Sequence, residues 1–294
     1  MGAAAALASS AMWALTSVLL ASQSARLRPL VMSGIRSLTA SLVLIGLLIA
    51  TDGIVQLQEM TIVTGLSMIG SGIMGQAVGD TLYINALGFL GVSRTFPITN
   101  AAYPFFTFVL AVILLGEELT WTLPVGGALI VVGITWIVLE QRRSDALNDH
   151  AIELVRGLVF AVAAASAWAT ATVWLRGGQG DLDAISAASL RIPAASIAVL
   201  GTIALTSKPS VVTRGLTRRS IAIVALAGLL GTGIGSVLFI YAVEHEGAAR
   251  TAFVTTSAPI FALPMGMLFL SEKLTPRILL GTALTIAGIW LVLL

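Results

Sequence analysis

Cysteine is absent from this sequence of 294 residues, and histidine occurs only twice, at His150 and His245. The absence of cysteine excludes disulfide bonds, thiolate metal sites and cysteine nucleophiles. Neither histidine belongs to the H-E-x-x-H pattern with which a helix binds zinc. No Ser/His set and no pair of carboxylates occurs within an apolar segment. We therefore expect no metal ion, no cofactor and no enzymatic activity.

Charged residues are also scarce, at 10% of the chain, whereas about 25% is usual for a soluble globular protein. Hydrophobic residues make up 57%, and the mean hydropathy is +0.99. Apolar runs of roughly 20 residues, the length that crosses a bilayer as a helix, recur along the whole chain. They predict an all-α integral membrane protein with ten transmembrane helices, at about 2–21, 30–50, 60–87, 93–115, 121–139, 155–175, 183–206, 220–243, 249–270 and 276–294.

Lysine and arginine predict the orientation of the chain, because they collect in cytoplasmic loops. Arg176 and Arg250 lie on one side of the membrane, and Arg36 and Arg191 lie inside spans. All the other basic residues fall in connections on the opposite side: Arg26, Arg28, Arg94, Arg142, Arg143, Arg156, Lys208, Arg214, Arg218, Arg219, Lys273 and Arg277. This bias predicts a multi-pass protein of the cytoplasmic membrane with both termini outside the cytoplasm. The connecting loop 140–154 is then cytoplasmic, and nothing indicates nucleic-acid binding.

Two stretches 155 residues apart have similar sequences. Residues 114–139 read LLGEELTWTLPVGGALIVVGITWIVL, and residues 269–294 read FLSEKLTPRILLGTALTIAGIWLVLL. At the same offset Trp13 returns as Trp168, and Arg36 returns as Arg191. With one residue inserted, Gly75, Gly79, Tyr83, Ala86, Gly91, Arg94 and Thr95 align with Gly231, Gly235, Phe239, Ala242, Gly247, Arg250 and Thr251. The sequence therefore predicts two repeats of five helices, 1–139 and 155–294.

Five spans in a repeat is an odd number, so the second repeat must enter the membrane from the opposite face. Inverted repeats of this kind are typical of secondary transporters, whose substrate site lies near the middle of the membrane between the repeats. The pattern predicts transport by alternating access, in which each half takes the conformation of the other in turn.

Two five-helix units, each with the LGE-x-LT…G…GI pattern near its end, resemble the EamA type of the drug/metabolite transporter superfamily. In this sequence the pattern covers residues 115–134 and, with serine in place of its first glycine, 270–289. The resemblance implies a ten-helix carrier, similar to bacterial exporters of amino acids or other small metabolites. It also implies a central cavity lined by helices 1, 3 and 4 and by helices 6, 8 and 9. Many members have cytoplasmic termini, whereas the basic residues here predict the reverse.

Aromatic and polar residues within the spans are candidates for binding the substrate. Trp13 and Trp168 lie near mid-span rather than at the membrane interface, where tryptophan usually collects. They either line a binding cavity or fill space between helices. The other candidates are the polar residues of helices 3, 4 and 8, some of which we expect to face the cavity: Gln76, Tyr83, Asn85, Asn100, Tyr103 and Tyr241.

Glycines four residues apart occur at matching positions of the third and eighth spans, as Gly75 and Gly79 and as Gly231 and Gly235. Small residues with this spacing allow helices to approach closely in a membrane. We expect tight helix packing at both places, which is compatible with a surface on which the helices slide during transport.

Charges within spans are costly in lipid and often mark function. Arg36 and Asp80 each lie about seven residues, or about 10 Å, from the same side of the membrane, so the sequence predicts that they form an ion pair. Asp80 aligns with Ser236, so Arg191 lacks the equivalent partner. We hypothesise that Arg191 binds the carboxylate of a substrate, with Trp13 and Trp168 beside it. The alternative for either arginine is a side chain that extends to the lipid headgroups.

The mode of coupling is open, because neither the first nor the sixth span contains an acidic residue that could carry a proton. The favoured function is export or exchange of small metabolites, most of all amino acids, including aromatic or hydrophobic ones. The alternative is export of lipophilic drugs or of other solutes such as nucleosides. The expected partners are the substrate and the lipid bilayer, and we expect a monomer.

Overall fold

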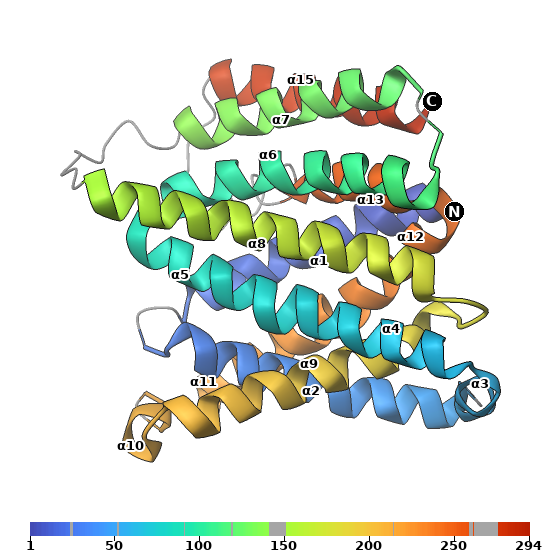
Figure 1. Ribbon diagram of the computed structural model, residues 1–294. Helices are drawn as coiled ribbons and strands as arrows, with labels where there is room; N and C mark the ends of the chain where they lie inside the picture. The colour runs from blue at the N-terminus through green and yellow to red at the C-terminus, as the bar shows by residue number, and fades with distance from the viewer. Residues whose placement is uncertain are drawn as a thin grey trace.

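Helices make up all the regular structure in the part of the chain that the computed structural model describes, residues 1–23, 26–51, 53–90, 92–118, 120–140, 151–213, 215–258, 261 and 276–294 (Figure 1). The helices, with η marking π-helical segments, are α1 (Gly2–Ala21), α2 (Pro29–Ala50), α3 (Gly53–Glu59), α4 (Ile62–Gly72), η1 (Ile73–Gly79), α5 (Asp80–Leu90), α6 (Val92–Leu110), η2 (Ala111–Leu115), α7 (Thr122–Glu140), α8 (Ala151–Gly178), α9 (Ala184–Thr206), α10 (Pro209–Val212), α11 (Arg218–Ala227), η3 (Gly228–Gly235), α12 (Ser236–Glu246), α13 (Ala248–Thr255) and α15 (Pro276–Leu293).

Six helices in the described part of the chain are long and apolar enough to span a membrane: Pro29–Ala50, Ile62–Ala86, Ile98–Leu115, Val155–Gly178, Ala184–Thr206 and Arg218–Glu246. Three shorter apolar helices, Gly2–Thr16, Thr122–Gly133 and Leu280–Val292, fall where further spans were predicted. The multi-pass helical membrane fold is therefore confirmed. The short helices α3 and α10 were not predicted, and both lie in connections between the expected spans. The π-helical segments were not predicted either, because local hydropathy does not distinguish them from the rest of a helical span.

The outward surface of the helices is strongly apolar. Leu42 on α2 and Ile197 on α9 are 64% and 73% exposed, and many other large apolar side chains are also exposed. The interior is built instead from small residues such as Ala40, Ala164 and Ser71, none of which is exposed. Small residues inside and large apolar residues outside suit a lipid environment, where small residues let helices pack closely and large apolar side chains contact acyl chains.

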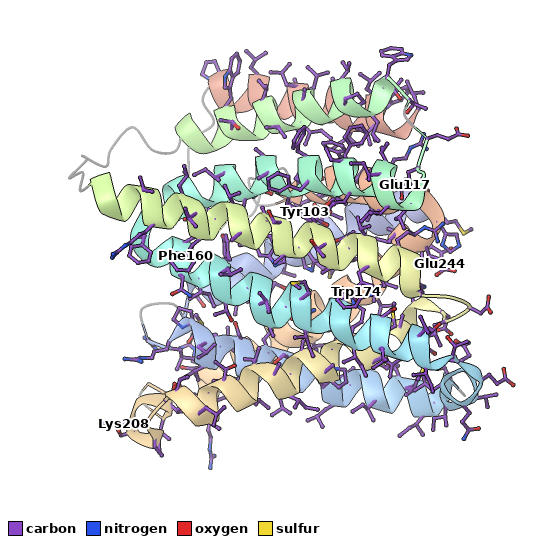
Figure 2. All side chains as sticks on the ribbon, in the orientation of Figure 1. Tyr103, Glu117, Phe160, Trp174, Lys208 and Glu244 are labelled. Atoms are coloured by element: carbon purple, nitrogen blue, oxygen red, sulfur yellow. The ribbon has the colours of Figure 1, made fainter. Side chains whose placement is uncertain are left out.

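Both termini lie at the same end of the helical bundle, which we call the terminal end (Figure 1). Glu117 and Glu244 lie at this end, and Lys208 lies at the opposite one (Figure 2). We call the opposite end the basic end, because Arg28 precedes α2 there and Arg218 and Arg219 begin α11. The unequal distribution of basic residues along the sequence thus becomes a difference between the two ends of the molecule.

Helices from before and after residue 150 are interleaved. Helix α1 packs on η3, α12 and α13, and α8 packs on α4, η1, α5 and α6. Helix α2 packs against α9, and α7 forms an extensive pair with α15 (Figure 1). At the α7–α15 crossing a Cβ on Gly126 would lie 2.7 Å from the carbonyl oxygen of Gly288, so glycine is required for the backbones to touch.

Several predicted positions lie outside the described residues. The connecting loop falls there except at its edges, and so does most of the expected ninth span. The individual positions are Gly91, Leu119, Arg142, Arg143, His150, Arg214, Leu270, Glu272, Lys273, Leu274 and Thr275, together with the side chains of Arg94 and Arg277.

Candidate substrate site between α5 and α8

The predicted ion pair between Arg36 and Asp80 is present. Nη2 of Arg36 on α2 donates to Oδ2 of Asp80 at 3.0 Å, at the start of α5. The indole Nε1 of Trp168 on α8 donates to the other carboxylate oxygen, Oδ1, at 3.1 Å. The two side chains of the ion pair are 24% and 23% exposed, so the pair is largely enclosed. Asp80 therefore joins three helices, α2, α5 and α8.

Aromatic rings surround the indole of Trp168. The ring of Tyr83, one turn beyond Asp80, lies 5.2 Å from it between centroids, and the ring of Tyr103 on α6 meets it edge-on at 6.4 Å. The Tyr103 hydroxyl is 3.1 Å from Oγ1 of Thr172, one turn after Trp168. Both distances suit favourable aromatic pairing, and the hydroxyl has a partner as burial requires. Figure 2 shows Tyr103 between the two ends of the bundle.

Trp13 occupies the matching position on α1 but has different partners. Its Nε1 donates to the backbone carbonyl of Gly231 at 3.1 Å, and its ring lies 5.4 Å from Phe239. On either side of Trp13, Ser9 donates to Gly235 O at 2.8 Å and Thr16 donates to Ala227 O at 3.4 Å. Three side chains of α1 thus bind backbone carbonyl groups of the π-helical segment η3 and of Ala227, the residue before it.

The glycine pairs of the third and eighth spans make the predicted close contacts. A Cβ on Gly75 would lie 3.0 Å from the Cβ of Ala171, and a Cβ on Gly79 would lie 2.5 Å from the Trp168 ring. A Cβ on Gly235 would lie 3.1 Å from Nε1 of Trp13. A Cβ on Gly231 would collide with Thr16. Glycine is therefore needed at Gly79 and Gly231 for the tryptophan-bearing helices to pack, and a side chain at Gly75 or Gly235 would be in tight contact with its neighbour.

Both arginines lie on helices that are in backbone contact with a π-helical span. A Cβ on Gly72 would overlap the carbonyl oxygen of Arg191, and a Cβ on Gly228 would overlap that of Arg36. These two contacts are related by the sequence offset, since Gly72 and Gly228 are 156 residues apart and the two arginines are 155 apart. Because the backbones touch, the Cα atom from which each arginine side chain extends is fixed relative to the neighbouring span.

Arg191 is the most enclosed of the charged side chains described, with 8% exposure. Its Nε is buried without a hydrogen-bond partner, and no carboxylate in the described part of the chain forms an ion pair with it. The phenol of Tyr103 lies within electrostatic range of its guanidinium. Helix α9 continues through Pro193, so the proline does not interrupt the helix beside Arg191.

Not all predicted site residues gather around Trp168. Gln76 is half-buried on η1, and Asn100 is half-buried on α6. Asn85 is exposed and donates to Thr81 O of its own helix at 2.8 Å. Tyr241 lies toward the terminal end, where its ring stacks on His245 at 4.0 Å. The structure thus brings Trp168, Tyr83 and Tyr103 together with the ion pair, but not Asn85 or Tyr241.

Among the described residues no three His, Asp or Glu side chains are close enough together to bind a metal ion. The arrangement around Asp80 and Arg191 offers hydrogen-bond donors, aromatic faces and one more positive charge than negative. Such a site can bind and orient a small polar or anionic molecule.

Sequence reasoning missed the polar contacts at the terminal end. Glu117 was noticed only as part of the repeated pattern, yet its carboxylate accepts hydrogen bonds from the backbone of Ala248 and Ala249 at 2.7 and 3.2 Å. Gln179 donates to Glu244 at 3.2 Å. The recurrence of a glutamate in the pattern was a signal, but its partner is 131 residues away and could not be identified from spacing.

These features define a helical multi-pass membrane protein with polar and aromatic side chains enclosed between its two halves. The chain belongs to the EamA-like transporter family, which matches residues 1–139 and 155–294. This confirms the resemblance that the repeated pattern indicated. The protein is accordingly a membrane transporter and not an enzyme.

The chain is also similar to three proteins whose names give no substrate. An uncharacterized protein of Pseudomonas aeruginosa is 30% identical over 187 residues, covering 64% of this chain and 60% of the relative. Two uncharacterized transporters of Archaeoglobus fulgidus are 25% and 28% identical, covering 79% and 64% of this chain and 77% and 63% of their own lengths. One solved crystal structure shares the fold, with a TM-score of 0.81, 16% identity, and coverage of 99% of this chain and 95% of its own.

Proposed function

We propose that this transporter exports or exchanges amino acids and similar small metabolites that carry a carboxylate, by alternating access across the cytoplasmic membrane. The substrate binds between α8, α9 and the third span, against Trp168 and Tyr103, with Arg191 holding its carboxylate. Trp13 and Gln76 are further candidate residues of this site.

The single observation that carries this proposal is the state of Arg191. It is enclosed, its Nε has no partner, and no carboxylate in the described part of the chain neutralises it. A buried cation without a counter-charge is strongly unfavourable, so an anionic group from outside the protein would relieve the cost. A guanidinium binds a carboxylate through two parallel hydrogen bonds, a geometry that an ammonium group does not reproduce.

Alternating access needs two halves that can exchange conformations, and the paired contacts support such an inverted repeat of five helices each, 1–139 and 155–294. Gly72 faces Arg191 as Gly228 faces Arg36, and Gly79 faces Trp168 as Gly235 faces Trp13. The π-helical segments η1 and η3 also occupy matching positions. Each contact joins one half to the other, as expected if an approximate twofold axis in the membrane plane relates them.

Transport into proteoliposomes tests the substrate. We expect saturable amino-acid flux that falls at least about tenfold in Arg191→Lys, because one bidentate charge-assisted pair is lost. Flux of a neutral solute should be spared, and the variant should retain the thermal stability of the native protein. Wild-type rate and affinity for carboxylate substrates in both Arg191→Lys and Arg191→Gln would refute the assignment.

The orientation that follows from the basic residues places both termini outside the cytoplasm. A reporter that is active only outside the cytoplasm should be active when fused after Leu294 and silent when inserted within 142–150. The reverse pattern would invert the direction proposed for export.

One observation favours a second candidate, export of lipophilic solutes. A groove of about 570 Å³ between α1, α9 and α12 is lined almost entirely by apolar groups, including Ala4, Ala8, Val237 and Leu238. The same proteoliposome screen separates the two functions. Flux of cationic lipophilic dyes without flux of amino acids would support the groove as the entry route.

A further inference from the structure

The first glutamate of the repeated pattern, Glu117, has no role in the proposed substrate site, yet among the described residues it makes the shortest hydrogen bond between the halves at the terminal end. Glu117 follows η2, at the end of the fourth span. Its Oε1 accepts from Ala248 N at 2.7 Å, and its Oε2 accepts from Ala249 N at 3.2 Å. Both donors belong to the first turn of α13, where backbone N–H groups lack partners within the helix. The carboxylate therefore supplies the cap of a helix from the other half.

Gly247 makes this contact possible. Its φ of 84° is one that residues with a side chain rarely adopt, and a Cβ at this position would lie 2.8 Å from Oε1 of Glu117. The backbone turn before α13 is therefore shaped to receive the carboxylate. A negative charge at a helix N-terminus is further stabilised by the helix dipole.

The contact adjoins a buried apolar cluster, which we call the seal. Ala111 of η2, Val173 of α8 and Phe253 of α13 pack in one buried cluster with Ala5 of α1 and Val292 of α15. This cluster draws on both halves of the chain. At the basic end, the described apolar side chains instead form two separate clusters, one around Leu27, Met32 and Val224 and the other around Ala86 and Ala161.

We propose that Glu117 is a latch that holds the terminal end shut, and that the transport path opens to this side when its carboxylate leaves the N-terminus of α13. This role of Glu117 rests on the proposed function, transport by alternating access. Release separates the end of the fourth span from α13 and exposes the seal beneath them. Glu272 is the matching residue in the sequence of the second repeat.

Two neighbouring glutamates provide controls for this assignment. Glu246 also accepts a hydrogen bond from a helix N-terminus, from Ala3 N at 2.9 Å. It joins α12 to α1, two helices that already pack along their length, so its loss should not open the path. Glu118 lines the same cavity of about 380 Å³ as Glu117 and Glu246 and tests for a general effect of removing charge there.

The experiment uses a single thiol in this cysteine-free chain. Thr251 lies one turn into α13, is fully buried, and has a hydroxyl without a hydrogen-bond partner, so Thr251→Cys removes no bond. The rate at which a membrane-impermeant methanethiosulfonate labels this thiol in detergent-solubilised protein reports opening of the terminal end. We expect Glu117→Gln to raise the rate about five- to tenfold, as loss of one charge-assisted cap implies. Glu246→Gln, Glu118→Gln and Glu272→Gln should leave it within about twofold.

A second reporter separates opening from loss of structure. Ala40→Cys places the thiol on α2 in a different buried cluster, so it reacts only if the whole protein loosens. An increase at both thiols, no increase at Thr251→Cys, or an equal increase in Glu246→Gln would each overturn the latch. Labelling requires no substrate, so its failure leaves the proposed substrate untouched. Failure of amino-acid flux likewise leaves the labelling result standing.

Discussion

Trp168 and Trp13 occupy matching positions on α8 and α1, but the two tryptophans are held by different kinds of group. The indole of Trp13 donates to a backbone carbonyl, and Ser9 and Thr16 make two more bonds of the same type. At the positions that match Ser9 and Thr16, α8 has Ala164 and Ala171, which cannot donate. Trp168 binds the carboxylate of Asp80 instead.

The two halves thus share their backbone packing but not their charged side chains. Glycine contacts recur on both sides, so the scaffold is nearly the same. Asp80 and Tyr83, in contrast, are matched by Ser236 and Phe239. The interface of α1 with η3 therefore depends on backbone carbonyls, which a substitution cannot remove. The interface of α8 depends on the side chain of Asp80, which also binds Arg36.

Replacing that side chain should have the largest effect on stability. Asp80→Asn leaves Arg36 enclosed without its counter-charge, and we expect the free energy of unfolding to fall by about 3 kcal/mol. Thermal unfolding in detergent measures the loss. Ser236→Ala, the matching change in the other half, should cost far less.

A double mutant tests whether the loss comes from the ion pair itself. Adding Arg36→Gln to Asp80→Asn removes the unpaired charge and should restore part of the stability. Additive losses in the two single variants and the double variant would mean that the residues do not interact energetically.

The two tryptophans should differ by a smaller amount. Trp168→Phe leaves a carboxylate oxygen without its donor and should cost about 2 kcal/mol, because hydrogen bonds to charged groups are the stronger class. Trp13→Phe leaves a neutral carbonyl and should cost about 1 kcal/mol beyond the common loss of ring volume. Denaturation of both variants under identical conditions compares them. Equal losses would show that the carboxylate adds nothing to the Trp168 interface.

The smallest effect is expected at Thr16. Thr16→Ala gives α1 the alanine that α8 has at the matching position and removes a hydrogen bond of 3.4 Å to Ala227 O. At this length the bond should contribute no more than about 0.5 kcal/mol. A loss above about 1.5 kcal/mol in thermal unfolding would mean that the bonds from α1 act cooperatively.

The sequence alone determined the membrane fold of this protein, the positions of its long apolar helices and the Arg36–Asp80 ion pair. These follow from quantities that are local or periodic. A bilayer requires a fixed length of apolar helix, and two opposite charges at the same depth in a membrane have few other partners. The repeated sequence also indicated the transporter family, because every residue of the pattern is read directly from the chain.

Only the tertiary structure decided which helices of one half pack against the other half, and which group each buried polar side chain contacts. Trp168 binds Asp80, whereas α8 has Ala164 and Ala171 where α1 has the donors Ser9 and Thr16, a difference that matters only once α8 lies on η1. Glu117 reaches the backbone of α13 because Gly247 turns the chain toward it, across 131 residues of sequence. Such contacts depend on how whole helices are placed by packing, and no periodic or local property of the sequence encodes that placement.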